Sequence, residues 1–237
     1  MPNARFCNPV FVALDTQDIS RARDLGAMLK PHVGGLKIGL EFITAHGPAG
    51  VRAVAALGLP LFADVKFHDI PNTVVGATKA LVGLGVSIFN IHASGGDAMM
   101  RASADAAASA SPRPLVLGVT VLTSLSDDDL SAVGQMGPAS TQVVRLALLA
   151  KSSGLDGVVC SPLEISQIRA ACGPDFLIVA PGVRPAGSDL ADQKRVMTPS
   201  EVVRAGADVL VIGRPITEAH DPVAAARAIA SEIKSLR

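Results

Sequence analysis

The chain has 237 residues, of which 49% are hydrophobic and 18% charged, and its mean hydropathy is +0.41. Its 21 Lys and Arg residues balance 21 Asp and Glu residues, and it has no basic run of the kind that marks a nucleic-acid-binding protein. The longest uncharged stretches, such as Ala80–Gly96, are shorter than the ~20 apolar residues that a membrane span requires. Three widely separated cysteines suit a reducing compartment better than a disulfide framework. We therefore expect a cytoplasmic protein that binds neither nucleic acid nor membrane.

Short apolar runs alternate with helical stretches along the whole sequence, which is typical of parallel βα units. Because eight such runs are each followed by a plausible helix, the pattern favours a single closed (β/α)8 barrel, or TIM barrel, over residues 1–237, and such barrels typically have about 250 residues. No Gly-x-Gly-x-x-Gly follows the first strand, which argues against a dinucleotide-binding sheet. We expect Pro185–Thr198 to be a loop before the seventh helix. The expected strands are Val10–Leu14, Gly35–Ile38, Leu61–Asp64, Ser87–Ile91, Leu115–Val121, Gly157–Val159, Phe176–Ala180 and Val209–Ile212.

Polar side chains gather where these strands end, and the active site of a parallel barrel lies at the C-terminal ends of its strands. We therefore expect a functional site at this rim, whereas the opposite strand ends show no comparable cluster. The rim residues, in strand order, are Asp15, Lys37, Asp64 with Lys66, His92, Thr123, Cys160-Ser161, Pro181-Gly182-Val183-Arg184 and Gly213-Arg214-Pro215.

The stretch Pro60–Thr73 carries the densest group of charges at the rim. Residues i and i+2 of a strand share a face, so Asp64 and Lys66 are expected to point the same way, and Asp69 lies beyond them in a turn. Lys37 belongs to the neighbouring strand, about 4.8 Å away, so with Asp69 close by the charges should alternate as Lys37, Asp64, Lys66 and Asp69. Such an array keeps the lysines protonated, and a protonated lysine in a dry pocket can stabilise a carbanion and donate a proton to it. An ion network that only caps the strand is the structural alternative.

Arg184 and Arg214 follow the seventh and eighth strands, where barrels commonly bind phosphate. Gly182 and Gly213 allow close backbone approach, and Pro215 suits the first turn of a helix whose N-terminus favours an anion. The planar guanidinium group can make two parallel hydrogen bonds to a phosphate. Either arginine alone could equally be a solvated surface charge.

The pattern Asp-x-Lys-x-x-Asp-Ile-x-x-Thr, formed by Asp64, Lys66, Asp69, Ile70 and Thr73, resembles that of the orotidine 5′-phosphate decarboxylase family. Lys37-Ile38-Gly39, Pro-Gly-Val-Arg and Gly-Arg-Pro extend the resemblance over nearly the whole chain. The resemblance implies decarboxylation of orotidine 5′-monophosphate to UMP and CO2, the last step of de novo UMP biosynthesis, with no cofactor and no metal. It assigns Lys66 as the proton donor to C6. Asp64 would lie near the departing carboxylate, and the sequence leaves open whether it repels that group or positions Lys66.

The resemblance also implies the remaining contacts. Asp15 and Lys37 could bind ribose hydroxyls, Thr123 the pyrimidine edge, and Ile70 and Pro181 would flank the base. The 5′-phosphate would be held by Arg184, Gln193, Gly213 and Arg214. Asp69, Ile70 and Thr73 would complete the site of a second subunit, so a homodimer with shared active sites is expected.

Two alternatives remain at this point. A related metal-dependent decarboxylase or aldolase of sugar phosphates has a similar Asp-x-Lys-x-x-Asp segment but carries a Glu where this chain has Lys37. A barrel that binds a nucleotide without catalysis is the other. His68 and His92 lack a metal-ligand spacing and are expected to be packing or supporting residues, and Cys160 a buried thiol.

Overall fold

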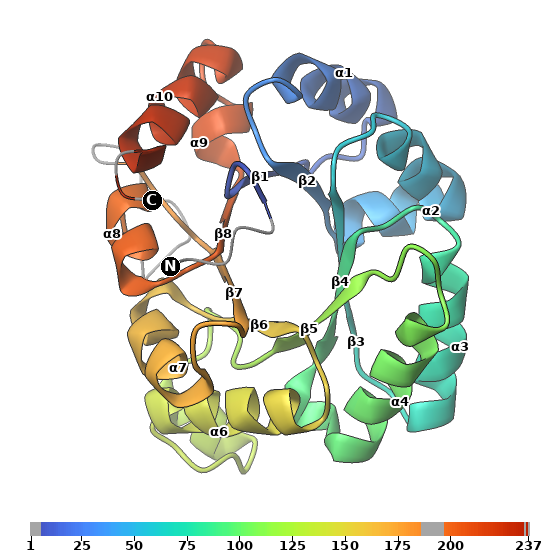
Figure 1. The fold of residues 1–237 in the computed structure, drawn as a ribbon, viewed down its shortest axis with the longest axis vertical. Coiled ribbons are helices and arrows are strands. Elements are labelled where there is room, and N and C mark those ends of the chain that lie inside the picture. The colour runs from blue at the N-terminus through green and yellow to red at the C-terminus, as the bar shows by residue number, and fades with distance from the viewer. Residues whose placement is uncertain (1–5, 186–196, 235, 237) are drawn as a thin grey trace.

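The computed structural model describes residues 6–185, 197–234 and 236, and its centre is a closed barrel of eight parallel strands (Figure 1). Each strand pairs with its neighbours in the chain, and β8 closes the barrel by pairing with β1. The strands are β1 (Val10–Ala13), β2 (Gly35–Ile38), β3 (Leu61–Phe67), β4 (Ile88–His92), β5 (Leu115–Val119), β6 (Gly157–Val159), β7 (Leu177–Pro181) and β8 (Val209–Ile212). The predicted barrel is confirmed. The largest differences in bounds are at β3, which is three residues longer than expected, and at β5, which is two residues shorter.

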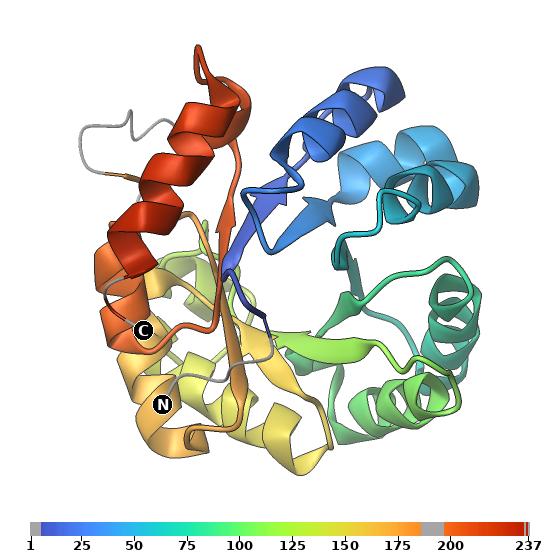
Figure 2. The ribbon, with the colours of Figure 1, turned by 45° about the horizontal axis from the view of Figure 1, so that its top comes forward.

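Helices surround the barrel, and a turned view shows them forming an outer ring around the strands (Figure 2). The helices are α1 (Ile19–Leu29), α2 (Leu40–Ala55), α3 (Pro71–Val82), α4 (Asp97–Ala108), α5 (Asp127–Ala132), α6 (Ala139–Ser152), α7 (Ile165–Cys172), α8 (Pro199–Ala205), α9 (Arg214–Thr217) and α10 (Pro222–Lys234), with short 3-10 turns at Ala93–Gly95 and Pro162–Glu164. Within the described ranges, none of the helices is long and apolar enough to cross a membrane. Most of the predicted loop Pro185–Thr198, including Gln193, lies outside the described residues.

The apolar core has two parts because alternate residues of each strand face opposite sides. A larger cluster lies between the strands and the helices, and a smaller one fills the inside of the barrel. Phe11, Phe62 and Ile88 belong to the inner cluster and are at most 2% exposed. Gly35 makes room for the Phe11 ring, since a Cβ at position 35 would lie 2.3 Å from Cε1 of that ring. By the same alternation, the side chains two positions further along β3 and β4, Asp64 and Asn90, lie on the barrel's inner side, toward the C-terminal ends.

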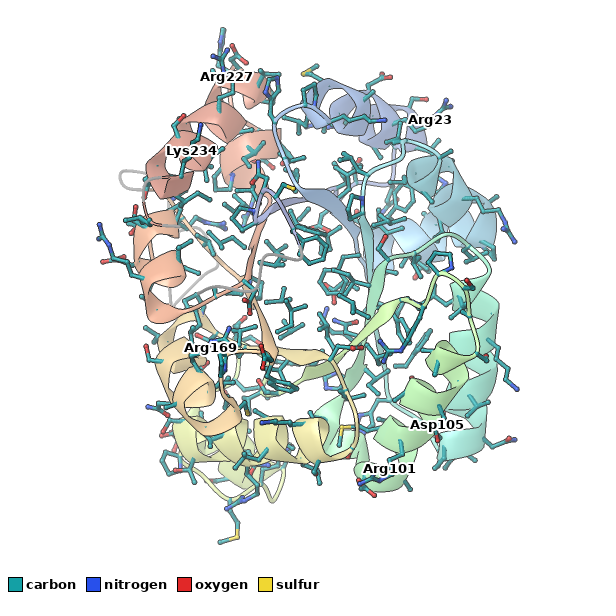
Figure 3. All side chains as sticks on the ribbon, viewed as in Figure 1. Arg23, Arg101, Asp105, Arg169, Arg227 and Lys234 are labelled. Carbon is teal, nitrogen blue, oxygen red and sulfur yellow. The ribbon has the colours of Figure 1, made fainter. Side chains whose placement is uncertain are left out.

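Charged side chains also join the strands at their N-terminal ends, so the expectation of no comparable cluster there was wrong. Asp208 immediately precedes β8 and is 1% exposed; it accepts hydrogen bonds from the backbone N–H of Ile178 (2.7 Å) and from Arg169 Nη2 (2.6 Å). Asp156, before β6, pairs with Arg113 at 2.8 Å in the same manner. Figure 3 shows Arg169 between α7 and the strands. These aspartates tie neighbouring strands together, which is a structural role.

Candidate active site

The end of β3 departs from a regular strand. Ala63 pairs with Phe89 and Phe67 with Ile91, so four steps along β3 match only two along β4, and β3 carries two extra residues in a bulge. Lys66 lies in this bulge with φ of +50°, the one non-glycine residue in the described chain with a positive φ. A side chain in this left-handed region costs about 1–2 kcal/mol. The simple i, i+2 rule therefore does not describe the local backbone, although the two predicted side chains still meet.

The acidic and basic groups at the rim form one connected chain, here called the charge quartet: Asp15, Lys37, Asp64 and Lys66. Lys37 Nζ lies 2.7 Å from Asp15 Oδ1 and 3.7 Å from Asp64 Oδ2, and Lys66 Nζ lies 2.6 Å from Asp64 Oδ1. Gly39 leaves room for the first pair, since a Cβ there would lie 3.1 Å from Lys37 Nζ. The predicted alternation is present, but its fourth member within the chain is Asp15.

Asp69 was expected in that alternation, and the structure places it elsewhere. Its side chain is exposed and accepts a hydrogen bond from the backbone N–H of Ile70 at 2.7 Å. Ile70 is 68% exposed and Thr73 is also exposed, at the start of α3. Pro71 begins that helix and fixes the turn. The three motif residues Asp69, Ile70 and Thr73 therefore face outward from the barrel that carries Lys66.

Asp64 is held ionised by its surroundings. Burial is the largest single influence and raises its pKa, but the ammonium groups of Lys37 and Lys66, with hydrogen bonds from Lys66 and Asn90, together hold the pKa below its ordinary value. The Asp64 side chain is only 17% exposed. A buried carboxylate with two cationic neighbours satisfies the requirement that buried charges be paired.

Sequence reasoning missed Asn90, which is fully buried on β4. Its Nδ2 donates to Asp64 Oδ1 at 2.7 Å, and its Oδ1 accepts from the backbone N–H of Lys66 at 2.8 Å. The available signal was an Asn inside the apolar run Ile88–Ile91, because a buried amide requires partners.

His68 and His92 lie beside this group, with ring centroids 5.2 Å apart. Burial, then His68 and Lys66, hold the pKa of His92 below its ordinary value, with Asp64 opposing them. In the part of the chain that the structure describes, no group of three or more His, Cys, Asp or Glu side chains is placed to hold a metal ion. Metal independence stays a prediction.

A cavity of about 180 Å³ opens beside Asp64 and Lys66. Its walls are mostly apolar, and Thr123 and Pro181 are among the residues that line it. Cys160 also lines it; the thiol is 1% exposed, as predicted, and burial raises its pKa. The other lining residues are Lys37, Phe62, Val119, Val121, Leu122, Val159 and Val211.

A second cavity, of about 350 Å³, adjoins the first and shares Lys37, Asp64, Pro181 and Val211 with it. We call its far end, formed by Gly182, Arg184, Gly213 and Arg214, the arginine corner. All four residues line the cavity, and Asp15 does too. Arg214 begins α9, with Pro215 in the first turn as predicted. Gln193 lies outside the described residues.

A parallel barrel with a lysine–carboxylate network and an arginine-lined cavity at its C-terminal rim is typical of enzymes of the (β/α)8-barrel class, whose active sites lie at this rim. Within that class, the chain belongs to the orotidine 5′-phosphate decarboxylase / HUMPS family, whose profile matches residues 8–229.

Named relatives cover almost the whole chain. It is 57% identical to the orotidine 5′-phosphate decarboxylase of Moorella thermoacetica over 96% of this chain and 93% of the relative. It is 55% identical to that of Paramagnetospirillum magneticum, over 95% and 98% of the two chains. Among solved structures, the orotidine 5′-phosphate decarboxylase of Lactobacillus acidophilus matches with a TM-score of 0.83 and 39% identity, over 96% of this chain and 99% of that one. The family resemblance seen in the motifs is confirmed.

Proposed function

We propose that this protein decarboxylates orotidine 5′-monophosphate to UMP and CO2, the last step of de novo UMP biosynthesis. One observation carries the proposal: Lys37 and Asp64 of the charge quartet line both the mostly apolar cavity of about 180 Å³ and the cavity that contains the arginine corner. The names of the relatives support the same substrate. A cytoplasmic location, expected from the cysteine content, is part of the proposal.

Lys66 is the proposed proton donor. When the bond between C6 and the carboxylate carbon breaks, the electron pair stays on C6 and CO2 leaves. The proton on Lys66 Nζ passes to C6, and the neutral amine then regains a proton from water. The 2.6 Å contact with Asp64 supports this role, because it favours the protonated lysine in the ground state and fixes the position of Nζ.

Asp64 is proposed to position Lys66, since its Oδ1 accepts hydrogen bonds from both Lys66 Nζ and Asn90 Nδ2. Its lowered pKa keeps it ionised at neutral pH. A substrate carboxylate bound next to it would meet a like charge, which is relieved when CO2 leaves. The contacts of Asp64 with Lys66 and Asn90 support positioning directly, and repulsion would act in addition.

The remaining contacts follow from the two cavities. Asp15 and Lys37 are proposed to bind ribose hydroxyls, because both line the space between the base cavity and the arginine corner. Thr123 would bond the base edge and Pro181 would contact its face. The phosphate would be held at the arginine corner, with Gln193 contributing from the segment outside the described residues.

We propose further that the protein is a homodimer with shared sites. Ile70 supports this, because an aliphatic side chain that is 68% exposed beside Asp69 is well suited to an interface. In a two-fold dimer the same surface of each subunit faces the other. Asp69, Ile70 and Thr73 of one subunit would then complete the site that contains Lys66 of its partner.

Lys37 is the feature that separates this proposal from a metal-dependent sugar-phosphate enzyme. Its ammonium group lies 3.7 Å from Asp64 Oδ2 and 2.7 Å from Asp15 Oδ1, where it would repel a divalent cation. A purely binding barrel is disfavoured for a different reason. Binding of a nucleotide does not require a lysine that is bonded to a carboxylate and lines the base cavity.

Release of CO2 from carboxyl-labelled orotidine 5′-monophosphate tests the proposal, together with calorimetric binding of UMP. We expect turnover of the labelled substrate and saturable UMP binding. Protein that binds UMP and releases no CO2 would be a non-catalytic binder. Protein that does neither would overturn the assignment of the substrate.

A further inference from the structure

Asn90 is the only side chain that the structure shows bonded to both the backbone and the carboxylate of the bulge in β3. It occupies the single β4 position between Phe89 and Ile91, which pair with Ala63 and Phe67 on the two sides of the bulge. A bulge interrupts the ladder of backbone hydrogen bonds. Asn90 replaces that ladder locally, since a primary amide offers a donor and an acceptor in nearly the geometry of a peptide group.

The orientation of this amide is determined by its partners. The backbone N–H of Lys66 can only donate, so the atom that faces it at 2.8 Å is the amide oxygen. An ionised Asp64 can only accept, so the atom 2.7 Å from its Oδ1 is the amide nitrogen. The two contacts agree on one orientation, and neither can be kept if the amide is reversed.

These contacts hold Lys66 in a conformation that a side chain rarely adopts. With φ of +50°, the backbone of Lys66 is strained and persists only where the surroundings fix it. Asn90 fixes the backbone nitrogen, while Asp64 Oδ1 binds the ammonium group at the other end of the same residue. The Asn90 amide therefore connects both ends of Lys66 to strand β4. It binds the backbone nitrogen directly and the ammonium group through Asp64.

We infer that Asn90 is a positioning residue for decarboxylation, which holds Lys66 and Asp64 in register for proton transfer. It does not line either cavity at the quartet, so it acts through those two residues and not on the substrate. This inference rests on the proposed function. It goes beyond that function by assigning the catalytic geometry to a residue outside the recognised motif.

Replacing Asn90 with leucine tests this role, because leucine is close in size and removes both hydrogen bonds. We expect kcat to fall about tenfold to a hundredfold, as for loss of a hydrogen bond to a charged group, with UMP affinity within about threefold of the parent. A matched control is Thr78→Val, which removes the buried Thr78–Ser103 hydrogen bond (2.9 Å) between α3 and α4, and should leave kcat unchanged. An unchanged kcat in Asn90→Leu would overturn the inference.

Asn90→Asp gives a second readout that a merely structural residue would not show. When protonated, the introduced carboxyl group can donate to Asp64 and accept from the Lys66 N–H, as the amide does; when ionised, it repels Asp64. The ratio of variant to parent kcat should therefore rise as the pH falls. A ratio that is independent of pH would contradict the inference, even if Asn90→Leu failed to fold.

The positioning also has a readout that does not depend on turnover. Hydrogen exchange at the Lys66 amide should be slow in the parent and faster by about tenfold or more in Asn90→Leu, because the acceptor of this N–H is then removed. Unchanged exchange would overturn the inference whether or not the protein decarboxylates orotidylate. Absence of CO2 release from the parent, by contrast, would count against the proposed function alone.

Discussion

Replacing Lys66 with alanine removes the proposed proton donor with little other disturbance. Alanine has a Cβ as lysine does, so the strain of the positive φ is the same before and after the change. The lysine side chain is 28% exposed, and its removal enlarges a cavity that already opens to the rim. Asp64 keeps Lys37 at 3.7 Å and Asn90 at 2.7 Å, so the carboxylate remains paired.

The expected loss follows from the charge that develops at C6. An ammonium group and a carbanion about 3 Å apart attract by about 5 kcal/mol at an effective dielectric constant of about 20. Proton donation by a placed acid contributes about 10²- to 10⁴-fold by itself. The two effects overlap because one N–H group supplies both, so kcat should fall by at least about 10⁴-fold. UMP carries no charge at C6, and its affinity should stay within about tenfold of the parent.

Release of CO2 under single-turnover conditions, with calorimetric binding of UMP, measures both quantities. Lys79→Ala, which removes an exposed lysine from the last turn of α3, is the matched control and should change neither. A kcat within tenfold of the parent would refute Lys66 as proton donor. A loss of UMP affinity as large as the loss of kcat would show that the lysine acts in binding instead.

Four further outcomes are expected. Arg214→Ala should weaken UMP binding by about tenfold to a hundredfold, the range for a charge-assisted hydrogen bond, and leave uridine binding unchanged. Gln193→Ala should have a smaller effect on UMP binding. Equal losses of affinity for UMP and uridine would place Arg214 away from the phosphate. Exhaustive chelation should leave CO2 release intact, whereas a loss that Mg²⁺ restores would favour the sugar-phosphate alternative. Mixing equal amounts of Lys66→Ala and Asp69→Ala subunits should restore about a quarter of all sites, since half of the dimers are hybrids with one intact site of two; no recovery after verified exchange would exclude a shared site. Asp208→Ala should lower the free energy of unfolding in urea by about 3–5 kcal/mol, because it breaks the buried pair with Arg169. The kcat of the folded protein should stay unchanged, because this pair lies far from the rim. A lower kcat in the folded protein would contradict a purely structural role for Asp208.

The barrel and most of the quartet could be predicted because they depend on regular features. Buried parallel strands appear in sequence as short apolar runs, and the bounds of β2, β6 and β8 were predicted to the residue. Lys37 and Asp64 follow from strand adjacency alone. Neighbouring strands of a barrel lie side by side, so a correct strand assignment is sufficient to predict that Lys37 and Asp64 lie close together.

The bulge could not be predicted in the same way. Lys66 has the left-handed backbone that usually signals glycine, and nothing in the local sequence announces it. Asn90 was missed because its importance depends on the partner strand being irregular. Within one chain Asp69 does not join the other charges, because the helix that begins at Pro71 carries it outward. Each of these errors arises where tertiary structure overrides a local rule.

The charge quartet has a consequence for how a ligand is oriented. Two carboxylates and two ammonium groups sum to a formal charge of zero, so the quartet as a whole exerts no net long-range pull on an anion. The second cavity, by contrast, is lined outside the quartet by Arg184 and Arg214 together with Glu218. In the proposed binding mode, the phosphate is held at the arginine corner and the reacting ring lies against groups whose charges are already matched with one another.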